Sequence, residues 1–171
     1  MDYNDQQTVW IAYIASNIAG ILILLAAVKL PKLARLFFVI LFGWACWINY
    51  TTAHTQPEIY LEYSNYALPF YKSFIQGWFA QNITLMVTLI AIGQGLIAVG
   101  MMLKGWWVKL ACAGIIIFLI GIAPLGIYAA FPFSITVSLA AYFIWRKDDL
   151  NYLWKFQLQA NRNRKKQMLH S

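Results

Sequence analysis

The sequence predicts an all-α fold, a polytopic membrane helix bundle with about five transmembrane helices and additional interfacial helices. The chain has 171 residues, of which 61% are hydrophobic and only 11% are charged. A soluble domain is about 45–50% apolar and about a quarter charged. The apolar residues also form long blocks, and a spanning helix needs about 20 of them in succession. Lys and Arg collect at the ends of these blocks, as they do in membrane proteins.

The first predicted span covers residues 8–28. The residues before it carry two aspartates and no Lys or Arg, which is not typical of a secretory signal peptide. Asn17 lies inside this span, and we expect it to form an interhelical hydrogen bond and only secondarily to line a ligand path. A basic turn around Pro31 follows, because proline ends one helix and can begin the next. Residues 1–33 therefore form an N-terminal unit with its own span.

The second predicted span covers residues 33–50 and has an aromatic end. Trp44 and Trp47 are three positions apart and share one helical face. They suit the aromatic belt at a membrane interface or packing in the core, and stacking against a partner or a ligand is the alternative.

Residues 51–81 form the one long connection, and it is rich in aromatic side chains. Pro57 and Pro69 each stand where a short helix can begin. Phe70, Phe74 and Trp78 recur at a spacing of four, which places them on one helical face. We therefore expect two short helices in the membrane interface, forming an aromatic segment outside the cytoplasm.

Three more spans are expected, at residues 82–104, 108–128 and 133–145. The first of these carries Gln94 between two glycines, and a glutamine at mid-depth should face protein or a cavity rather than lipid. Pro124 predicts a kink or a helix end in the second. The third is short for a span, so we expect a tilt or a partly buried end.

Residues 146–171 are predicted to form a basic amphipathic tail on the membrane surface. Asp148 and Asp149 occupy a plausible helix start. The tail ends in a basic cluster that would contact lipid headgroups or a partner: Arg162, Arg164, Lys165 and Lys166. With five spans, 12 of the 13 Lys and Arg residues lie on the side of the tail. The positive-inside rule then places the C-terminus in the cytoplasm and the N-terminus outside it.

Several classes of site are not supported by the sequence. Cys46 and Cys112 lie in apolar helices without a CxxC pattern, which argues against a disulfide or a zinc site. His54 with the two glutamates that follow it lacks the convergent spacing of a metal site, so we expect no metal. The net charge of +7 comes without a DNA- or RNA-binding signature, so nucleic acid is not an expected partner.

Part of the chain is similar to a known family. The run from Arg35 to Trp44 has an Arg-Leu pair followed by phenylalanines and a glycine, an aromatic segment with Pro69 follows, and Gln94 then stands in a glycine-rich span. In these features residues 34–145 resemble the DoxX-like membrane proteins, a four-helix family that often has glutamate where this chain has Gln94. The resemblance implies a four-helix core, with the first span as an extra helix. Family members are linked to quinone-coupled thiosulfate oxidation, redox maturation and oxidative-stress complexes.

Two functions remain open from the sequence. The first is an accessory or scaffold subunit of a membrane complex, without a catalytic centre of its own and with membrane lipids and other membrane subunits as partners. The alternative is a DoxX-like component of a redox pathway that binds a quinone or a lipid; otherwise no cofactor is expected. Either would reside in a bacterial inner membrane. The candidate ligand-binding residues are Gln94, Asn17, Asn49, Trp44, Trp47, Tyr71 and Trp78.

Overall fold

The computed structural model describes residues 3–155, which form helices and turns without a strand. The long helices are α1 (Tyr3–Lys29), α2 (Pro31–Thr55), α4 (Ile83–Met102), α5 (Trp106–Ile122) and α6 (Phe133–Lys147). The short elements are η1 (Pro57–Asn65), α3 (Pro69–Phe74), the π-helical turn η2 (Ile75–Phe79), η3 (Ala123–Ala129) and η4 (Leu153–Lys155). Pro57 and Pro69 each begin a short helix, as predicted.

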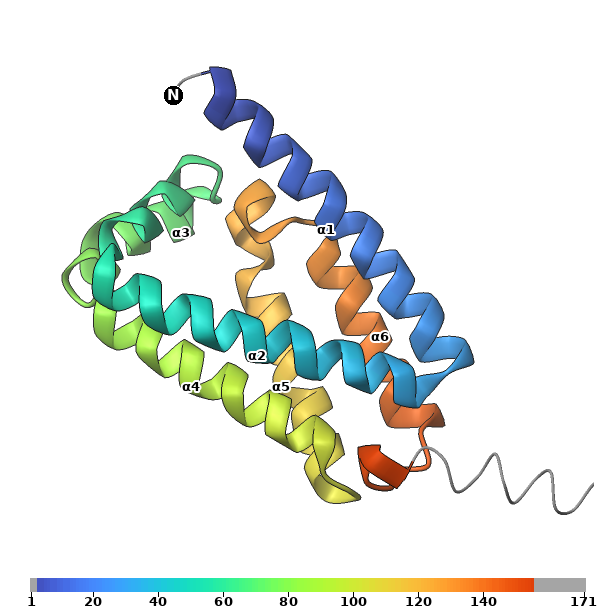
Figure 1. Ribbon diagram of the computed structural model, residues 1–171. Helices are drawn as coiled ribbons and strands as arrows, with labels where there is room; N and C mark the ends of the chain where they lie inside the picture. Colours follow the sequence, from blue (N-terminus) through green and yellow to red (C-terminus); the bar gives the residue numbers. More distant parts are fainter. Residues whose placement is uncertain (1–2, 156–171) are drawn as a thin grey trace, which may run out of the picture.

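The helices form a bundle closed at one end by the aromatic connection (Figure 1). The chain direction makes α2 and α4 antiparallel, and they pack along their lengths. Next, α5 packs on α4, and α6 packs on α5. The first helix, α1, lies along α6 and α2. Residues 57–79, named the cap here, cover the end of the bundle where α2 stops and α4 starts.

Helix α4 shows why this is a membrane protein. Its inward face carries the buried residues Val87, Ala91, Gln94, Ala98 and Met101. Its outward face is equally apolar, with five side chains each more than half exposed: Leu85, Leu89, Ile92, Leu96 and Val99. A soluble protein rarely exposes such a continuous apolar surface, whereas lipid accommodates it. Four helical stretches, in α1, α2, α4 and from α5 into η3, are long and apolar enough to cross a membrane.

The predicted fourth and fifth spans have modified ends. The regular helix α5 stops at Ile122 and the tighter helix η3 carries Pro124, which accounts for the break expected there. Helix α6 has 15 residues, which at a rise of 1.5 Å per residue gives roughly 22 Å, less than the hydrocarbon core of a bilayer.

The buried side chains form two clusters. The larger one lies away from the cap and joins all five long helices, with Phe38, Met101 and Ile115 fully buried at its centre. The smaller one joins Ile75 and Phe79 of the cap to Ala53 of α2 and to Ile83 and Val87 of α4. Residues of both clusters line the cavity described below.

Candidate functional site

A cavity of about 320 Å³ lies between the bundle and the cap. Its apolar lining consists of Leu41, Phe42, Ala45, Phe74, Ile75, Phe79, Met86, Val87, Ile90, Phe118, Leu119, Ile122, Leu125, Ala129 and Phe133. Its polar lining consists of Asn49, Tyr60, Tyr63, Tyr71 and Gln94. An apolar pocket with a few polar groups is the usual form of a small-molecule site.

The polar groups include a hydrogen-bonded relay that runs from the cap into the bundle. The Tyr60 hydroxyl donates to Asn49 Oδ1 at 2.9 Å. Asn49 Nδ2 in turn donates to Gln94 Oε1 at 2.9 Å. Gln94 is only 4% exposed, so its amide would be costly without such partners. The relay therefore links one cap residue to one residue each from α2 and α4.

The Tyr60 hydroxyl, which lies in the cap outside the spanning helices, is held in its neutral form. Burial raises the pKa of Tyr60 to about 12, and the neighbouring Tyr63 adds to the increase. A hydrogen bond with the Thr52 side chain acts in the opposite direction and is outweighed. At neutral pH Tyr60 is thus a hydrogen-bond donor to Asn49.

The cap is attached to the far wall of the cavity as well. The Tyr71 hydroxyl donates to the Gly121 carbonyl at 2.6 Å, and the Leu68 amide donates to the Pro124 carbonyl at 3.0 Å. Gly126 has a φ of +68°, and a Cβ atom there would lie 2.7 Å from the Tyr66 carbonyl oxygen. Only glycine allows this close approach of the two backbones.

The last turn of the cap turns apolar side chains into the cavity. In η2, Gly77 has non-helical dihedral angles of φ −98° and ψ −107°. Ile75 and Phe79 on either side of it are buried and line the cavity. Trp78 is 53% exposed and stacks on Phe74 instead.

The structure brings three of the sequence-predicted ligand residues together and separates the other four. Gln94, Asn49 and Tyr71 all line the cavity. Asn17 lies apart from it and donates to the carbonyls of Tyr13 and Ala130, at 2.9 and 3.2 Å. The remaining three residues do not line the cavity either: Trp44, Trp47 and Trp78.

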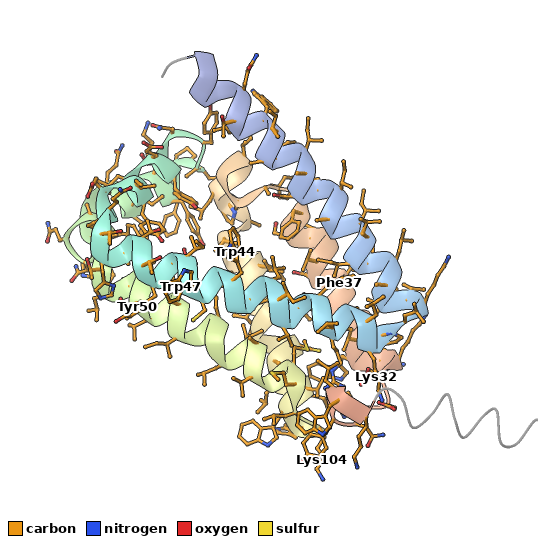
Figure 2. The ribbon with its side chains drawn as sticks, in the orientation of Figure 1. Lys32, Phe37, Trp44, Trp47, Tyr50 and Lys104 are labelled. Carbon is orange, nitrogen blue, oxygen red and sulfur yellow. The ribbon has the colours of Figure 1, made fainter. Side chains whose placement is uncertain are left out.

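The two tryptophans of α2 lie on the outer surface of that helix. Trp44 is 63% exposed and Trp47 is 67% exposed. Figure 2 shows them along the same helix as Phe37 and Tyr50. Their position suits contact with lipid or with another protein, not with a molecule in the cavity.

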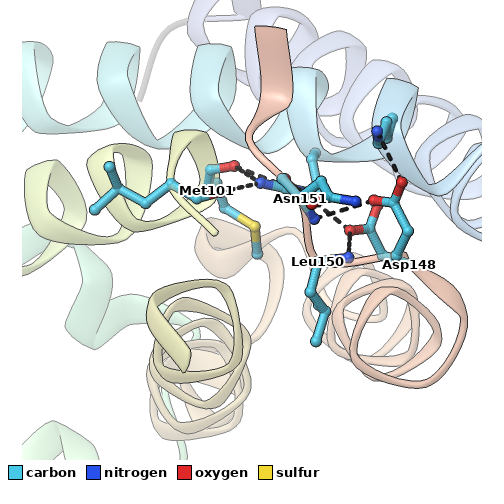
Figure 3. Close-up of polar contacts among 8 residues, drawn as sticks. Met101, Asp148, Leu150 and Asn151 are labelled. Carbon is cyan, nitrogen blue, oxygen red and sulfur yellow. Dashed lines mark hydrogen bonds and ion pairs between the residues drawn. The ribbon is translucent and has the colours of Figure 1, made fainter. Parts of the chain in front are cut away.

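A buried arginine cluster at the other end of the bundle was not apparent from the sequence. Arg35 has no exposed surface and donates to the carbonyls of Met101, Leu103 and Asn151 at 2.6–3.0 Å (Figure 3). It also pairs with Asp148 at 2.8 Å. The sequence indicated only a basic turn here. The guanidinium instead satisfies carbonyls left free at the end of α4.

This cluster corrects the expected start of the tail helix. Helix α6 continues to Lys147 and ends there, and residues 148–152 are not helical. Asp148 and Asp149 accept hydrogen bonds from the amides of Leu150 and Asn151, as in Asx-turns. The backbone leaves the helical conformation here, with Asp148 extended at φ −71° and ψ 147° and Leu150 in the left-handed region at φ +53°. The basic cluster expected at Arg162, Arg164, Lys165 and Lys166 lies outside the described residues.

The residues that the structure describes contain no group of His, Cys, Asp and Glu side chains arranged to hold a metal ion. The cavity lining likewise contains none of these four residue types. Comparison with protein-family models, with curated proteins and with solved structures returns no match for this chain.

Proposed function

We propose that this membrane protein binds an apolar small molecule with a polar head group, of the quinone or lipid class, in the cavity beneath the cap. The observation that carries the proposal is the combination of an apolar wall with the Tyr60–Asn49–Gln94 relay. The volume of about 320 Å³ is within the range of small-molecule sites, which is roughly 300–1,000 Å³. Without an ionisable carboxylate, imidazole or thiol in the lining, the site is suited to binding and orienting a ligand.

The resemblance to DoxX-like proteins is part of the same proposal. The cavity is surrounded by α2, α4, α5 and α6 together with the cap, and α1 contributes no lining residue. This arrangement agrees with a four-helix core to which α1 has been added. A role in a quinone-linked redox pathway would then follow from the ligand, with the redox chemistry performed by a partner.

A binding experiment with a filled cavity tests the proposal. Ala45 lines the cavity on α2, and Ala45→Phe would place a ring inside it. Ile40 is 60% exposed on the same helix, so Ile40→Phe places the same ring outside. We expect the full-length protein in nanodiscs to bind a short-tailed benzoquinone or a labelled phospholipid, Ile40→Phe to bind equally, and Ala45→Phe to lose binding. Equal binding by both variants would refute a ligand site in this cavity.

A role as an accessory subunit is the second candidate, and one surface favours it. Phe37, Ile40, Trp44 and Trp47 are exposed on α2 at alternating spacings of three and four. Large apolar residues in this pattern form the ridge by which one helix packs on another. Affinity purification in mild detergent should recover a membrane partner, and Trp44→Leu with Trp47→Leu should release it. Recovery of the polypeptide alone would argue against this role.

The proposed orientation has the cap outside the cytoplasm and the end of α6 inside, in a bacterial inner membrane. The basic residues of the α1–α2 turn, of the α4–α5 turn and of the end of α6 all lie opposite the cap, whereas Lys72 lies within it. Lys32 and Lys104 are labelled at this basic end in Figure 2. A reporter enzyme that works only in the cytoplasm should therefore be active when it is fused after residue 171.

A further inference from the structure

We infer that the relay makes the cavity selective for head groups that accept a hydrogen bond, such as a carbonyl, over head groups that chiefly donate one, such as a phenol. Tyr60 is the positioning residue for this selectivity, because it acts on the ligand through Asn49 and Gln94. The inference rests on the proposed function and adds the chemical class of head group that the site prefers.

The direction of the relay begins at the Tyr60 hydrogen. The hydroxyl oxygen lies 2.9 Å from Asn49 Oδ1 and 3.4 Å from the Asn49 backbone carbonyl oxygen. A backbone carbonyl can only accept. The Tyr60 hydroxyl hydrogen therefore has an acceptor whether it points to the Asn49 side chain or to the Asn49 backbone. Tyr60 therefore donates to Asn49.

The orientation of Asn49 then determines that of Gln94. Because Asn49 Oδ1 accepts from Tyr60, the atom that faces Gln94 is the amino nitrogen Nδ2, and it must donate. Gln94 receives this bond on Oε1 at 2.9 Å. The part of the Gln94 amide that the relay does not use is the Nε2 amino group, which can only donate. A reversed Asn49 would lose the short bond from Tyr60.

The hydroxyl hydrogens of Tyr71 and Tyr60, which also line the cavity, are already used within the protein. The Tyr71 hydroxyl hydrogen is used in its 2.6 Å bond to the Gly121 carbonyl. Tyr60 uses its hydrogen on Asn49. The Tyr63 ring stacks on the Tyr60 ring, with 6.0 Å between the ring centroids. The Gln94 amino group is thus the donor that the relay presents to a molecule in a mostly apolar cavity.

A donor in an apolar cavity discriminates by the cost of leaving it unpaired. A quinone carbonyl would accept from Gln94 Nε2 and satisfy it. A hydroquinone of the same size brings O–H groups whose oxygens are weaker acceptors and whose hydrogens find no acceptor on the Gln94 amino group. Sites built to hydrogen-bond a ligand reject analogues that leave buried polar groups unpaired.

The test measures the affinity of the full-length protein in nanodiscs for a short-tailed benzoquinone and, under anaerobic conditions, for its hydroquinone. We expect the quinone to bind about tenfold more tightly, as one lost neutral hydrogen bond implies. Tyr60→Phe frees the Asn49 amide to reverse, and we expect its quinone-to-hydroquinone ratio to fall toward one. Tyr50→Phe removes an exposed hydroxyl on α2 outside the cavity lining, and it should keep the ratio of the unaltered protein.

The outcomes separate this inference from the proposed function. If neither probe binds and phospholipid does not bind either, the proposed function fails and the inference fails with it. If both probes bind equally to the unaltered protein, the ligand site stands and the selectivity is refuted, without reference to any variant. If Tyr60→Phe keeps the full ratio, Tyr60 is not the positioning residue.

Discussion

Arg35 and Asp148 form an ion pair across 113 positions of sequence, with 0% and 1% of their side chains exposed. The pair ties the start of α2 to the residues that follow α6, and Arg35 also holds the end of α4 through the Met101 carbonyl. One Asp148 oxygen, Oδ2, has no hydrogen-bond partner, which makes the carboxylate depend all the more on Arg35.

Arg35→Met should destabilise the protein by about 3–5 kcal/mol, because it leaves the Asp148 carboxylate buried without its partner. Lys32→Met is the matched control, since Lys32 pairs with Asp149 at 2.9 Å in a more exposed position. Exposed pairs contribute about 0–1 kcal/mol. Thermal unfolding in detergent measures both, and equal midpoints for the two variants would contradict the assignment of Arg35 as the anchor of this end.

Gly126→Ala should loosen the cap. The new Cβ would lie 2.7 Å from the Tyr66 carbonyl oxygen at a φ of +68°, so the strain of about 1–3 kcal/mol falls on the contact between η3 and the cap. Gly121→Ala introduces the same methyl group with no atom within 4 Å. Proteolysis of the cap should therefore accelerate in Gly126→Ala alone, and protection of both variants would count against this contact.

Gly100 and Gly93 should respond to alanine in opposite directions. A Cβ at Gly100 would lie 3.0 Å from Ala111 Cβ and 3.2 Å from the Trp107 carbonyl oxygen, where α4 and α5 approach closely. A Cβ at Gly93, on the same helix, meets no atom within 4 Å. Gly93→Ala should gain up to about 1 kcal/mol from helix propensity, whereas Gly100→Ala should lower the unfolding midpoint. A gain in both would mean that the helices can separate without cost.

Acid should weaken the segment after α6. Burial raises the pKa of Asp149, but hydrogen bonds from Lys32 and the Asn151 amide outweigh it and leave that pKa below its usual value. The Asp149 carboxylate therefore binds a proton more readily in the unfolded chain than in the folded one. The contribution to stability is present above the ordinary aspartate pKa of about 3.9 and is lost as the pH falls below it. Asp149→Asn lacks this contribution, so its unfolding midpoint should fall less between neutral pH and about pH 3.

Local patterns in the sequence predicted the elements well. Pro57, Pro69 and Pro124 mark the starts of the cap helices and the end of regular helix in α5, because proline acts on its own backbone and that of the preceding turn. Gln94 could be recognised as a polar side chain facing inward because its helix is otherwise apolar.

What the sequence did not predict depends on distant partners. In the sequence Arg35 looks like part of a basic turn. Only its hydrogen bonds to the carbonyls of Met101 and Leu103 show that it is buried. Tyr60 is one of many aromatic residues in the cap. Its role in the relay becomes visible only through its hydrogen bond to Asn49. Asn17 and Gln94 look alike in sequence, yet Asn17 pairs with backbone carbonyls away from the cavity.

The packing of α1 on α6 has a consequence for how the chain is assembled during synthesis. The ribosome makes α1 before α2, α4 and α5, while its main neighbour α6 is made after α5. A methyl group at Gly20 of α1 would lie 2.9 Å from the Phe133 ring of α6, so this contact is close and specific. The face of α1 that α6 covers must therefore stay in contact with lipid until α6 is made. A ribosome stalled before residue 133 should leave α1 accessible to crosslinking by lipids on the face that α6 later covers.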